Sequence, residues 1–145
     1  MIKLSKRVEY GLLAVQHMAC CPGQVVSAKD VAEKFGISLA LVAKVLQLLV
    51  REDIVTSYHG ANGGYVLSRD ANDVSIADVI HAIEGRQGAI VDCQDHDGSS
   101  DCSVHENCTI RQPLSILQER INTTFKTMSV AELSDKRHLI QLEVS

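Results

Sequence analysis

Apolar residues recur at helical spacing through the first half of the chain. The first such run covers residues 6 to about 19, and Pro22 ends it. Ser27 and Asp30 have the spacing of a capping box, which predicts the start of a second, short helix that Gly36 terminates. The pattern therefore predicts two helices in quick succession.

A third helix is expected after a very short turn. Ser38 is the predicted N-cap, and the stripe that the helix would bury consists of Val42, Val45, Leu46 and Leu49. Two helices joined by so tight a turn are typical of a helix-turn-helix. Residues 54–58 and 65–67 are β-branched or aromatic for the most part and flank a glycine-rich turn, which predicts a β-hairpin, the wing of a winged helix.

Three further helices are expected in the second half. Ser75 and Asp78 form another capping-box pattern, for a helix that ends at Gly85. Thr109 with Gln112 is the expected cap of a long helix, whose apolar stripe consists of Leu114, Leu117, Ile121, Phe125 and Met128. We expect the same helix of a second copy to cover this stripe and form a two-fold dimer. Ser129 with Glu132 predicts the last, short helix.

The formal net charge of −4 hides an asymmetry between the two halves of the chain. Residues 1–70 contain eight Lys and Arg against six Asp and Glu, whereas residues 71–145 contain six against twelve. Attraction to phosphate is therefore expected in the first half. No apolar run approaches the roughly 20 residues of a membrane span and no apolar signal segment opens the chain, so we expect a cytoplasmic protein with no membrane partner.

The third helix is the predicted reader of the major groove. Its outward residues, Ser38, Leu39, Ala40, Leu41, Ala43 and Lys44, offer few hydrogen bonds, so we expect thymine methyl contacts and DNA shape to contribute. The predicted phosphate contacts are Lys3, Lys6, Arg7, Lys44 and Arg51, and the wing would bring His59 and Asn62 to the backbone or minor groove. A protein-binding winged helix, with these charges simply solvated, is the alternative.

Three of the five cysteines fall in one polar segment. Cys93, Cys102 and Cys108 are separated by eight and then five residues in an acidic, glycine- and serine-containing stretch that reads as a loop. Thiolates that converge from such a loop suit an iron-sulfur cluster, while a thiol or disulfide switch and a zinc site are the alternatives. The spacing is wider than in a typical zinc knuckle.

The other two cysteines, Cys20 and Cys21, end the first predicted helix. We expect them to be small buried core residues, because free cysteine is among the most buried residue types. No set of nucleophile, base and orienting group is visible, and no phosphate-binding glycine motif follows a strand, so an enzyme is not expected.

Four stretches together carry a resemblance to a known family. They are residues 4–10 (LSKRVEY), 31–38 (VAEKFGIS) and 60–67 (GANGGYVL), and the three-cysteine segment. The chain, from residue 1 to about 133, resembles the iron-sulfur-linked winged-helix transcription regulators typified by IscR, NsrR and RirA. This resemblance implies a homodimer crossed through the long C-terminal helix, a cluster near the dimer interface, and DNA affinity or target choice that changes with the state of the cluster.

The resemblance also bears on the fourth ligand of the cluster. IscR-like members have a histidine three residues after the third cysteine, but Arg111 stands at that place here, and a guanidinium does not ligate. In NsrR-like members an acidic residue of the partner's first helix is the ligand, and Glu9 stands at that place. Glu9 is thus the first candidate, before His105 and His96, and an ordinary salt bridge is its alternative role.

Two departures from the family concern DNA. The predicted reader helix has Ala40, Leu41 and Ala43 where IscR-like proteins place polar or aromatic groups, so its operator is expected to differ. His59 replaces a wing arginine that is common in the family, which removes one expected contact or makes it pH-dependent.

The whole pattern predicts a mainly α protein with a small β-hairpin. We assign residues 1–85 to a winged helix-turn-helix DNA-binding domain, 86–109 to a cysteine-containing cluster-binding loop, and 110–145 to a dimerisation helix and tail. The predicted function is a dimeric repressor or dual regulator that binds a palindromic operator and senses iron-sulfur, iron or redox status through a 2Fe-2S or 4Fe-4S cluster. The alternative is a cluster-free repressor switched by cysteine oxidation, a small ligand or a protein partner.

Overall fold

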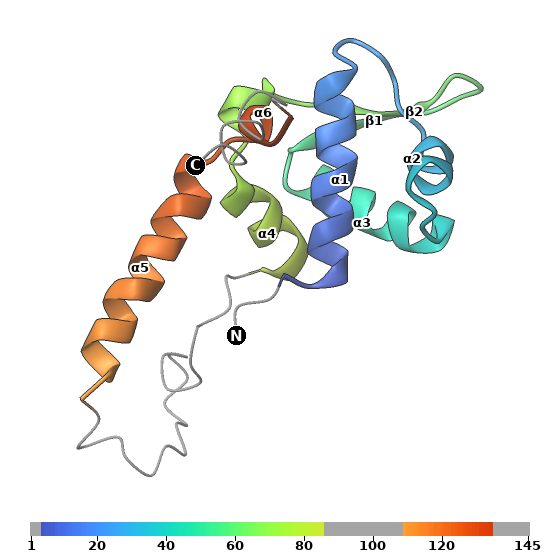
Figure 1. Cartoon of the computed structure of the whole chain (residues 1–145). Helices are drawn as coiled ribbons and strands as arrows, with labels where there is room; N and C mark the ends of the chain where they lie inside the picture. Colours follow the sequence, from blue (N-terminus) through green and yellow to red (C-terminus); the bar gives the residue numbers. More distant parts are fainter. Residues whose placement is uncertain (1–3, 86–108, 135–145) are drawn as a thin grey trace, which may run out of the picture.

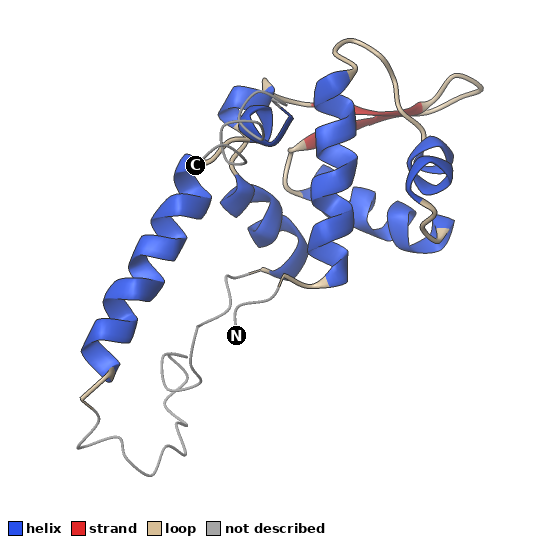
Figure 2. Ribbon diagram, in the orientation of Figure 1, coloured by secondary structure: helices blue, strands red, loops and turns tan. Residues whose placement is uncertain are grey.

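Helices and one hairpin build the fold, as the hydrophobic pattern predicts (Figures 1 and 2). The computed structural model describes residues 4–85 and 109–134, so Lys3, His96, His105 and the cysteines Cys93, Cys102 and Cys108 lie outside the described residues. The elements are α1 (Lys6–Cys20), α2 (Ala28–Phe35), α3 (Leu39–Arg51), β1 (Val55–Tyr58), β2 (Gly64–Leu67), the 3-10 turn η1 (Ala71–Asp73), α4 (Ile76–Glu84), α5 (Arg111–Thr127) and α6 (Val130–Ser134).

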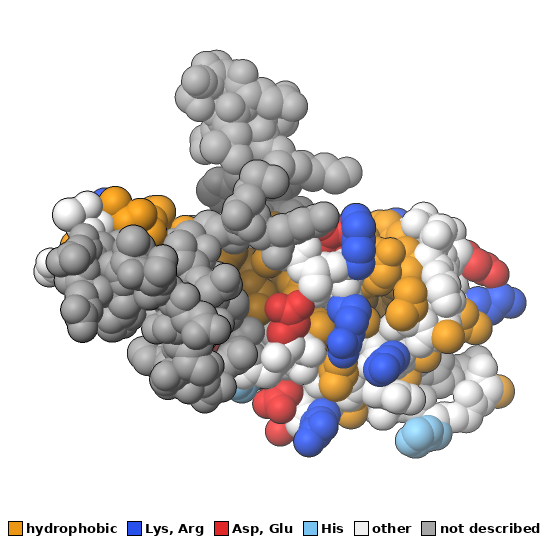
Figure 3. Space-filling model, turned by 90° about the horizontal axis from the view of Figure 1, so that it is seen from below, with side chains coloured by type: hydrophobic (Ala, Val, Ile, Leu, Met, Phe, Trp, Pro, Cys, Tyr) orange, Lys and Arg blue, Asp and Glu red, His pale blue; other side chains and the backbone are white. Residues whose placement is uncertain are grey.

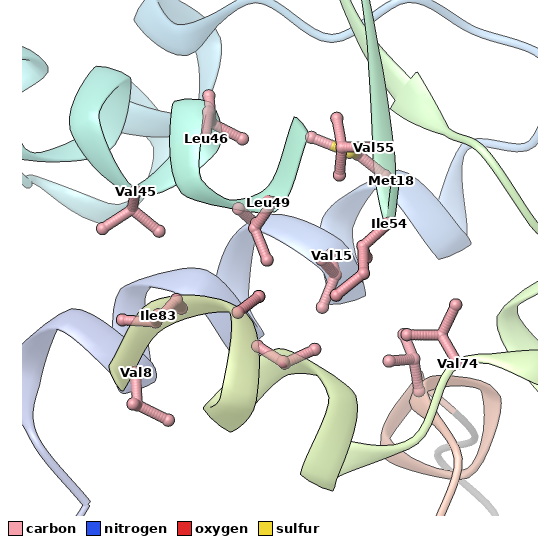
Figure 4. Packing of buried hydrophobic residues seen from close by; sticks show 14 of the residues in the cluster. Val8, Val15, Met18, Val45, Leu46, Leu49, Ile54, Val55, Val74 and Ile83 are labelled. Atoms are coloured by element: carbon pink, nitrogen blue, oxygen red, sulfur yellow. The ribbon is translucent and has the colours of Figure 1, made fainter. Parts of the chain in front are cut away.

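The core lies between α1, α3 and α4 (Figure 4). Val15 of α1 and Leu49 of α3 are fully buried, and the stripe predicted for α3 is buried along its whole length. Val130 of the last helix is also fully buried, so α6 is anchored in the same core although it follows the long α5. Burial of these apolar side chains supplies the main favourable term in folding.

Gly11 marks the closest approach of α1 to α4. A Cβ at this position would collide with the Ile83 side chain of α4 and would lie in van der Waals contact with Val45 of α3 and Val79 of α4. Gly11 is itself buried. The absence of a side chain at Gly11 therefore lets the three helices pack closely at this point. Glycine is a poor helix former, so the close packing is obtained at a cost to the stability of α1 itself.

Most of the helix caps follow the sequence prediction. Ser27 with Asp30 and Ser75 with Asp78 form complete capping boxes, and Gly36 and Gly85 end α2 and α4 in the left-handed conformation. Both hydrogen bonds of the pair Ser129 and Glu132 are present before α6.

The predicted cap of α5 is wrong. The helix begins at Arg111 with Ile110 as its N-cap, and no side chain caps it, so neither Thr109 nor Gln112 has the predicted role. Pro113 stands in the first turn, where the missing N–H costs nothing because first-turn amides lack helical partners.

The hairpin has a defined register that begins with Val55 opposite Leu67 and ends with Tyr58 opposite Gly64. Val26, just before α2, adds two backbone hydrogen bonds to Tyr65, of 2.9 and 2.7 Å. The wing is therefore fastened to the segment that leads into the helix-turn-helix.

The cysteine pair at the end of α1 departs from the prediction. Cys20 is exposed and Cys21 is only partly buried, so the expectation that both are core residues is wrong. Met18 is still buried at this end of α1, whereas Cys20 lies off the buried face of the helix and Cys21 is the C-cap residue. Both thiols are free.

No residue of α5 is fully buried. Ile116 and Leu117 are 48 % and 45 % exposed, and Met128 after the helix is 37 % exposed. In Figure 1, α5 projects beside α4 and lies apart from α1 to α3. No helix within the described ranges is both long and apolar enough to cross a membrane.

Replacing Gly11 with valine is expected to destabilise the protein by about 2 kcal/mol, because extra methyl groups in a packed site force neighbours out of place. Denaturation by urea measures the loss. The matched control is Cys20→Val, at the exposed end of the same helix, which is expected to change stability by less than about 0.5 kcal/mol. Equal stability of the two variants would contradict the close packing assigned to Gly11.

Candidate nucleic-acid interface

The turn between α2 and α3 holds the two helices in a helix-turn-helix. Gly36 adopts φ 64° and ψ 38°, a conformation that favours glycine, and its amide donates to the Ala32 carbonyl. The Ile37 amide donates to the same oxygen at 2.9 Å. The two bonds close α2 and direct the chain at once into α3, which we call the recognition helix.

The outward face of the recognition helix contains the residues that the sequence predicts. Ser38, Leu39, Ala40, Leu41 and Lys44 are exposed, whereas Ala43 is partly buried and not fully outward. Leu39 and Leu41 are 52 % and 41 % exposed, an unusual cost for two leucines in water that contact with thymine methyl groups would relieve.

Ser38 takes the N-cap position without using its side chain for capping. The other Ser caps, for example Ser27 and Ser75, accept a hydrogen bond from the third residue of their helix. The Ser38 hydroxyl has no hydrogen-bond partner among the described residues and is exposed. It is therefore free to reach a base edge or a phosphate at the start of the recognition helix.

Gln47 is an outward residue that the sequence reasoning missed. It is exposed and follows Lys44 by three residues, so helical spacing places both on one side of the helix with Arg51. Its amide can form the bidentate contact that distinguishes adenine in the major groove. The helical spacing carries this signal, because Gln47 lies between Lys44 and Arg51 on the side of the helix that both share.

A groove of about 480 Å³ separates the recognition helix from the wing. Gln47 of α3, His59 of the wing and Ser27 before α2 all line it, and we call it the recognition groove. His59 and Asn62 are both exposed in the turn at the end of the hairpin. The fold thus brings a wing residue and a recognition-helix residue to one groove.

Lys6 and Arg7 are exposed in the first turn of α1. The Lys6 ammonium donates to the Glu9 carboxylate at 2.8 Å, and this hydrogen bond, together with the charge of Glu9, raises the pKa of Lys6. Arg7 has no ion-pair partner in the described part of the chain. Of the two, Arg7 is the cation that is free for a phosphate.

Polar contacts hold α2 against α1. Lys34 Nζ lies 2.9 Å from His17 Nδ1, and the His17 ring meets the Phe35 ring edge-on. Partial burial, and then the charge of Lys34, lower the pKa of His17, which favours the neutral ring. The capping bonds from the Ser27 amide and hydroxyl group lower the pKa of Asp30 and keep that carboxylate ionised at the start of α2.

The charges on the exposed surface are mixed in sign. Figure 3 shows Lys and Arg side chains among apolar ones, with Asp and Glu side chains between them. Among residues 4–85 and 109–134, no three His, Cys, Asp or Glu side chains are grouped so that they could hold a metal ion.

A sequence model of the Rrf2 family, described as an iron-dependent transcriptional regulator, matches residues 4–136. The chain belongs to the Rrf2 family. It is therefore a transcriptional regulator of that family, whose members bind DNA, and the resemblance drawn from the sequence is confirmed.

Solved structures of Rrf2-type regulators share this fold. CymR of B. subtilis, the global cysteine regulator, is 22 % identical with a TM-score of 0.73, over 92 % of this chain and 97 % of its own. IscR of T. potens is 25 % identical with a TM-score of 0.68, over 91 % and 85 %. An oxidised form of S. aureus CymR is 22 % identical with a TM-score of 0.71, over 92 % and 97 %. The predicted fold class, a winged helix followed by a long helix, is confirmed.

Replacement of Gln47 with alanine is expected to weaken binding to specific DNA about tenfold, because a bidentate base contact is worth about 1–3 kcal/mol. Lys44→Ala and Arg51→Ala are instead expected to weaken binding to any duplex and to lower its salt dependence by about one phosphate contact each. Binding is measured by fluorescence anisotropy over a range of salt concentrations.

The specific duplex is selected by the wild-type protein from a random pool, and an unselected duplex of equal length serves for comparison. Arg120→Ala, on α5 and away from the helix-turn-helix, is the matched control and should bind as the wild type does. If Gln47→Ala weakened both duplexes equally, Gln47 would not read a base.

Proposed function

We propose that this Rrf2 regulator represses or both represses and activates genes according to the state of an iron-sulfur cluster held by Cys93, Cys102 and Cys108. The observation that carries the proposal is the family's description as iron-dependent, combined with three soft sulfur donors in one polar segment between the winged helix and α5. Residues 1–85 would bind DNA, 86–109 the cluster, and 110–145 a second subunit.

The described residues leave Glu9 available as a fourth ligand. Its side chain is 40 % exposed, and its only described ion pair is with the even more exposed Lys6. An exposed pair of this kind is easily broken, so the carboxylate can turn toward a second subunit. The same ion pair supports the alternative in which Glu9 has no ligand role, and His105 and His96 then follow as candidates.

A bound cluster would supply a centre that iron supply or oxidants change. In the sequence, the segment with the three cysteines lies between Gly85, at the end of α4, and Thr109, before α5. Any preference of the cluster-bound form for DNA requires an equal preference of the DNA-bound form for the cluster. The sensing segment is thus joined directly to both the DNA-binding half and the helix proposed for dimerisation.

A cluster-free switch is the second candidate, and a specific observation supports it. Three of the similar structures are of CymR, and one of these is an oxidised form. In this reading Cys102 and Cys108 form a disulfide on mild oxidation. Peptide mapping separates the two mechanisms, because a cluster protein releases iron and sulfide before any disulfide forms.

Changing all three segment cysteines to serine is expected to remove iron, acid-labile sulfide and visible absorption from protein purified without oxygen. DNA binding should then no longer respond to iron. The matched control changes Cys20 and Cys21 to serine, which should leave all three signals intact because those thiols stand at the opposite end of α1 from Glu9. Glu9→Gln in the same assay tests its ligand role.

Colour, iron and regulation that persist in the triple serine variant would overturn the proposal. A colourless wild-type protein that forms the Cys102 to Cys108 disulfide would favour the second candidate instead.

We also propose that a second copy covers the apolar stripe of α5. The stripe contains half-buried residues, such as Ile121, and exposed ones, such as Leu117. A helix of 17 residues is about 25 Å long and offers one continuous face to an identical helix. Two recognition helices related by a two-fold axis would read a palindromic operator.

The change Leu117→Asp is expected to convert the dimer to a monomer, because it places two like charges in the apolar contact. Sedimentation velocity measures the mass against the 15.8 kDa of one chain. Thr123→Asp, on the polar side of α5, should remain dimeric, and circular dichroism should show both variants folded. A Leu117→Asp dimer as tight as the wild type would exclude this face.

A further inference from the structure

A second cavity lies where the base of the hairpin, α4 and the turn from α5 to α6 meet. Its volume is about 630 Å³, within the range of about 300–1,000 Å³ that small-molecule sites occupy. Ile54 and Ala77, both buried, supply its apolar wall. The other lining residues are mainly polar or charged. We call it the charged cavity.

Backbone hydrogen bonds join the segments next to the charged cavity. The Ile76 amide donates to the Met128 carbonyl at 2.9 Å, and the Val130 amide donates to the Val74 carbonyl at 2.8 Å. The capping boxes that open α4 and α6 use the polar groups of Ser75 and Ser129, which both line the cavity. The backbone and cap groups here are therefore already satisfied, and the site is preformed.

Four charged side chains around the cavity have no such hydrogen-bond partners. Glu52 and Asp73 are acidic, and Arg69 and Lys126 are basic. None of the four forms a side-chain hydrogen bond or ion pair with another residue in the described part of the chain. Two unpaired charges of each sign thus line the hollow. Asp78, whose carboxylate accepts the Ser75 amide in the capping box, and His81 line it as well.

This balance of charges selects the chemistry of the ligand. A simple anion would meet two carboxylates, and a simple organic cation would meet a guanidinium and an ammonium. A metal ion is excluded in the described residues because no three His, Cys, Asp or Glu side chains come close enough together. A small molecule with one carboxylate and one ammonium satisfies both pairs, and each charge-assisted hydrogen bond is stronger than a neutral one.

We propose that the charged cavity binds a free α-amino acid, with its carboxylate on Arg69 and Lys126 and its ammonium on Glu52 and Asp73. The volume leaves room for a side chain next to Ile54 and Ala77. Arg69 follows β2 and Lys126 lies near the end of α5, so the bound amino acid joins the wing to the C-terminal helix. This second input is independent of the cysteine segment and goes beyond the function proposed above.

Thermal unfolding and isothermal titration of the full-length wild-type protein test the site. Each common L-amino acid is supplied singly at millimolar concentration, together with its analogue that lacks the ammonium group. At least one amino acid should raise the unfolding temperature and bind, while its analogue should not. Arg69→Met and Asp73→Asn should each weaken that binding about tenfold or more, because each loses a charge-assisted hydrogen bond.

Lys126→Met provides a third variant if either of the first two fails to fold. Lys29→Met, an exposed change on α2, is the matched control and should bind as the wild type does. The triple serine variant should also bind normally, which separates this proposal from the cluster proposal. The site is overturned if no amino acid binds, if the analogues bind equally, or if the cavity variants retain full affinity.

Discussion

The contact between α1, α3 and α4 at Gly11 is the constraint on which the rest of the structure depends. It allows Val45 of α3 and Ile83 of α4 to pack against the bare backbone of α1. The buried stripe of α3 is thereby fixed, so its opposite face must point outward. A DNA-reading surface made largely of small and apolar side chains needs this rigidity, because it has few hydrogen bonds with which to correct a misplaced helix.

Local signals account for most of the fold that could be predicted. Capping boxes can be predicted from four neighbouring residues, and terminal glycines from single positions. Both features are present in the structure at α2 and α4. The errors arose where local rules compete with surroundings. Thr109 has a side chain of a type that caps helices, yet α5 starts after Ile110. Cys20 ends an amphipathic helix but lies off the face that Met18 buries.

The candidate DNA interface was predictable to a lesser degree. Helical spacing identified the outward residues of the first half of α3, and the same rule extended by one turn would have identified Gln47. The recognition groove could not be predicted, because it depends on the hairpin register and on the bridge between Val26 and Tyr65. The charged cavity is still less local, since its lining comes from three separate stretches of the chain, residues 52–54, 69–81 and 126–129.

The acidic net charge is compatible with DNA binding because the excess positive and excess negative charges lie in different halves of the chain. Phosphate contact needs cations near the recognition helix, where Lys44 and Arg51 are exposed on one face. Acidic residues concentrate in the second half, and like charges of this kind would repel the phosphates of a duplex. A regulator arranged in this way depends on correct orientation more than on total attraction. A ligand that moved α5 relative to the wing would therefore change the orientation on which DNA binding by this regulator depends.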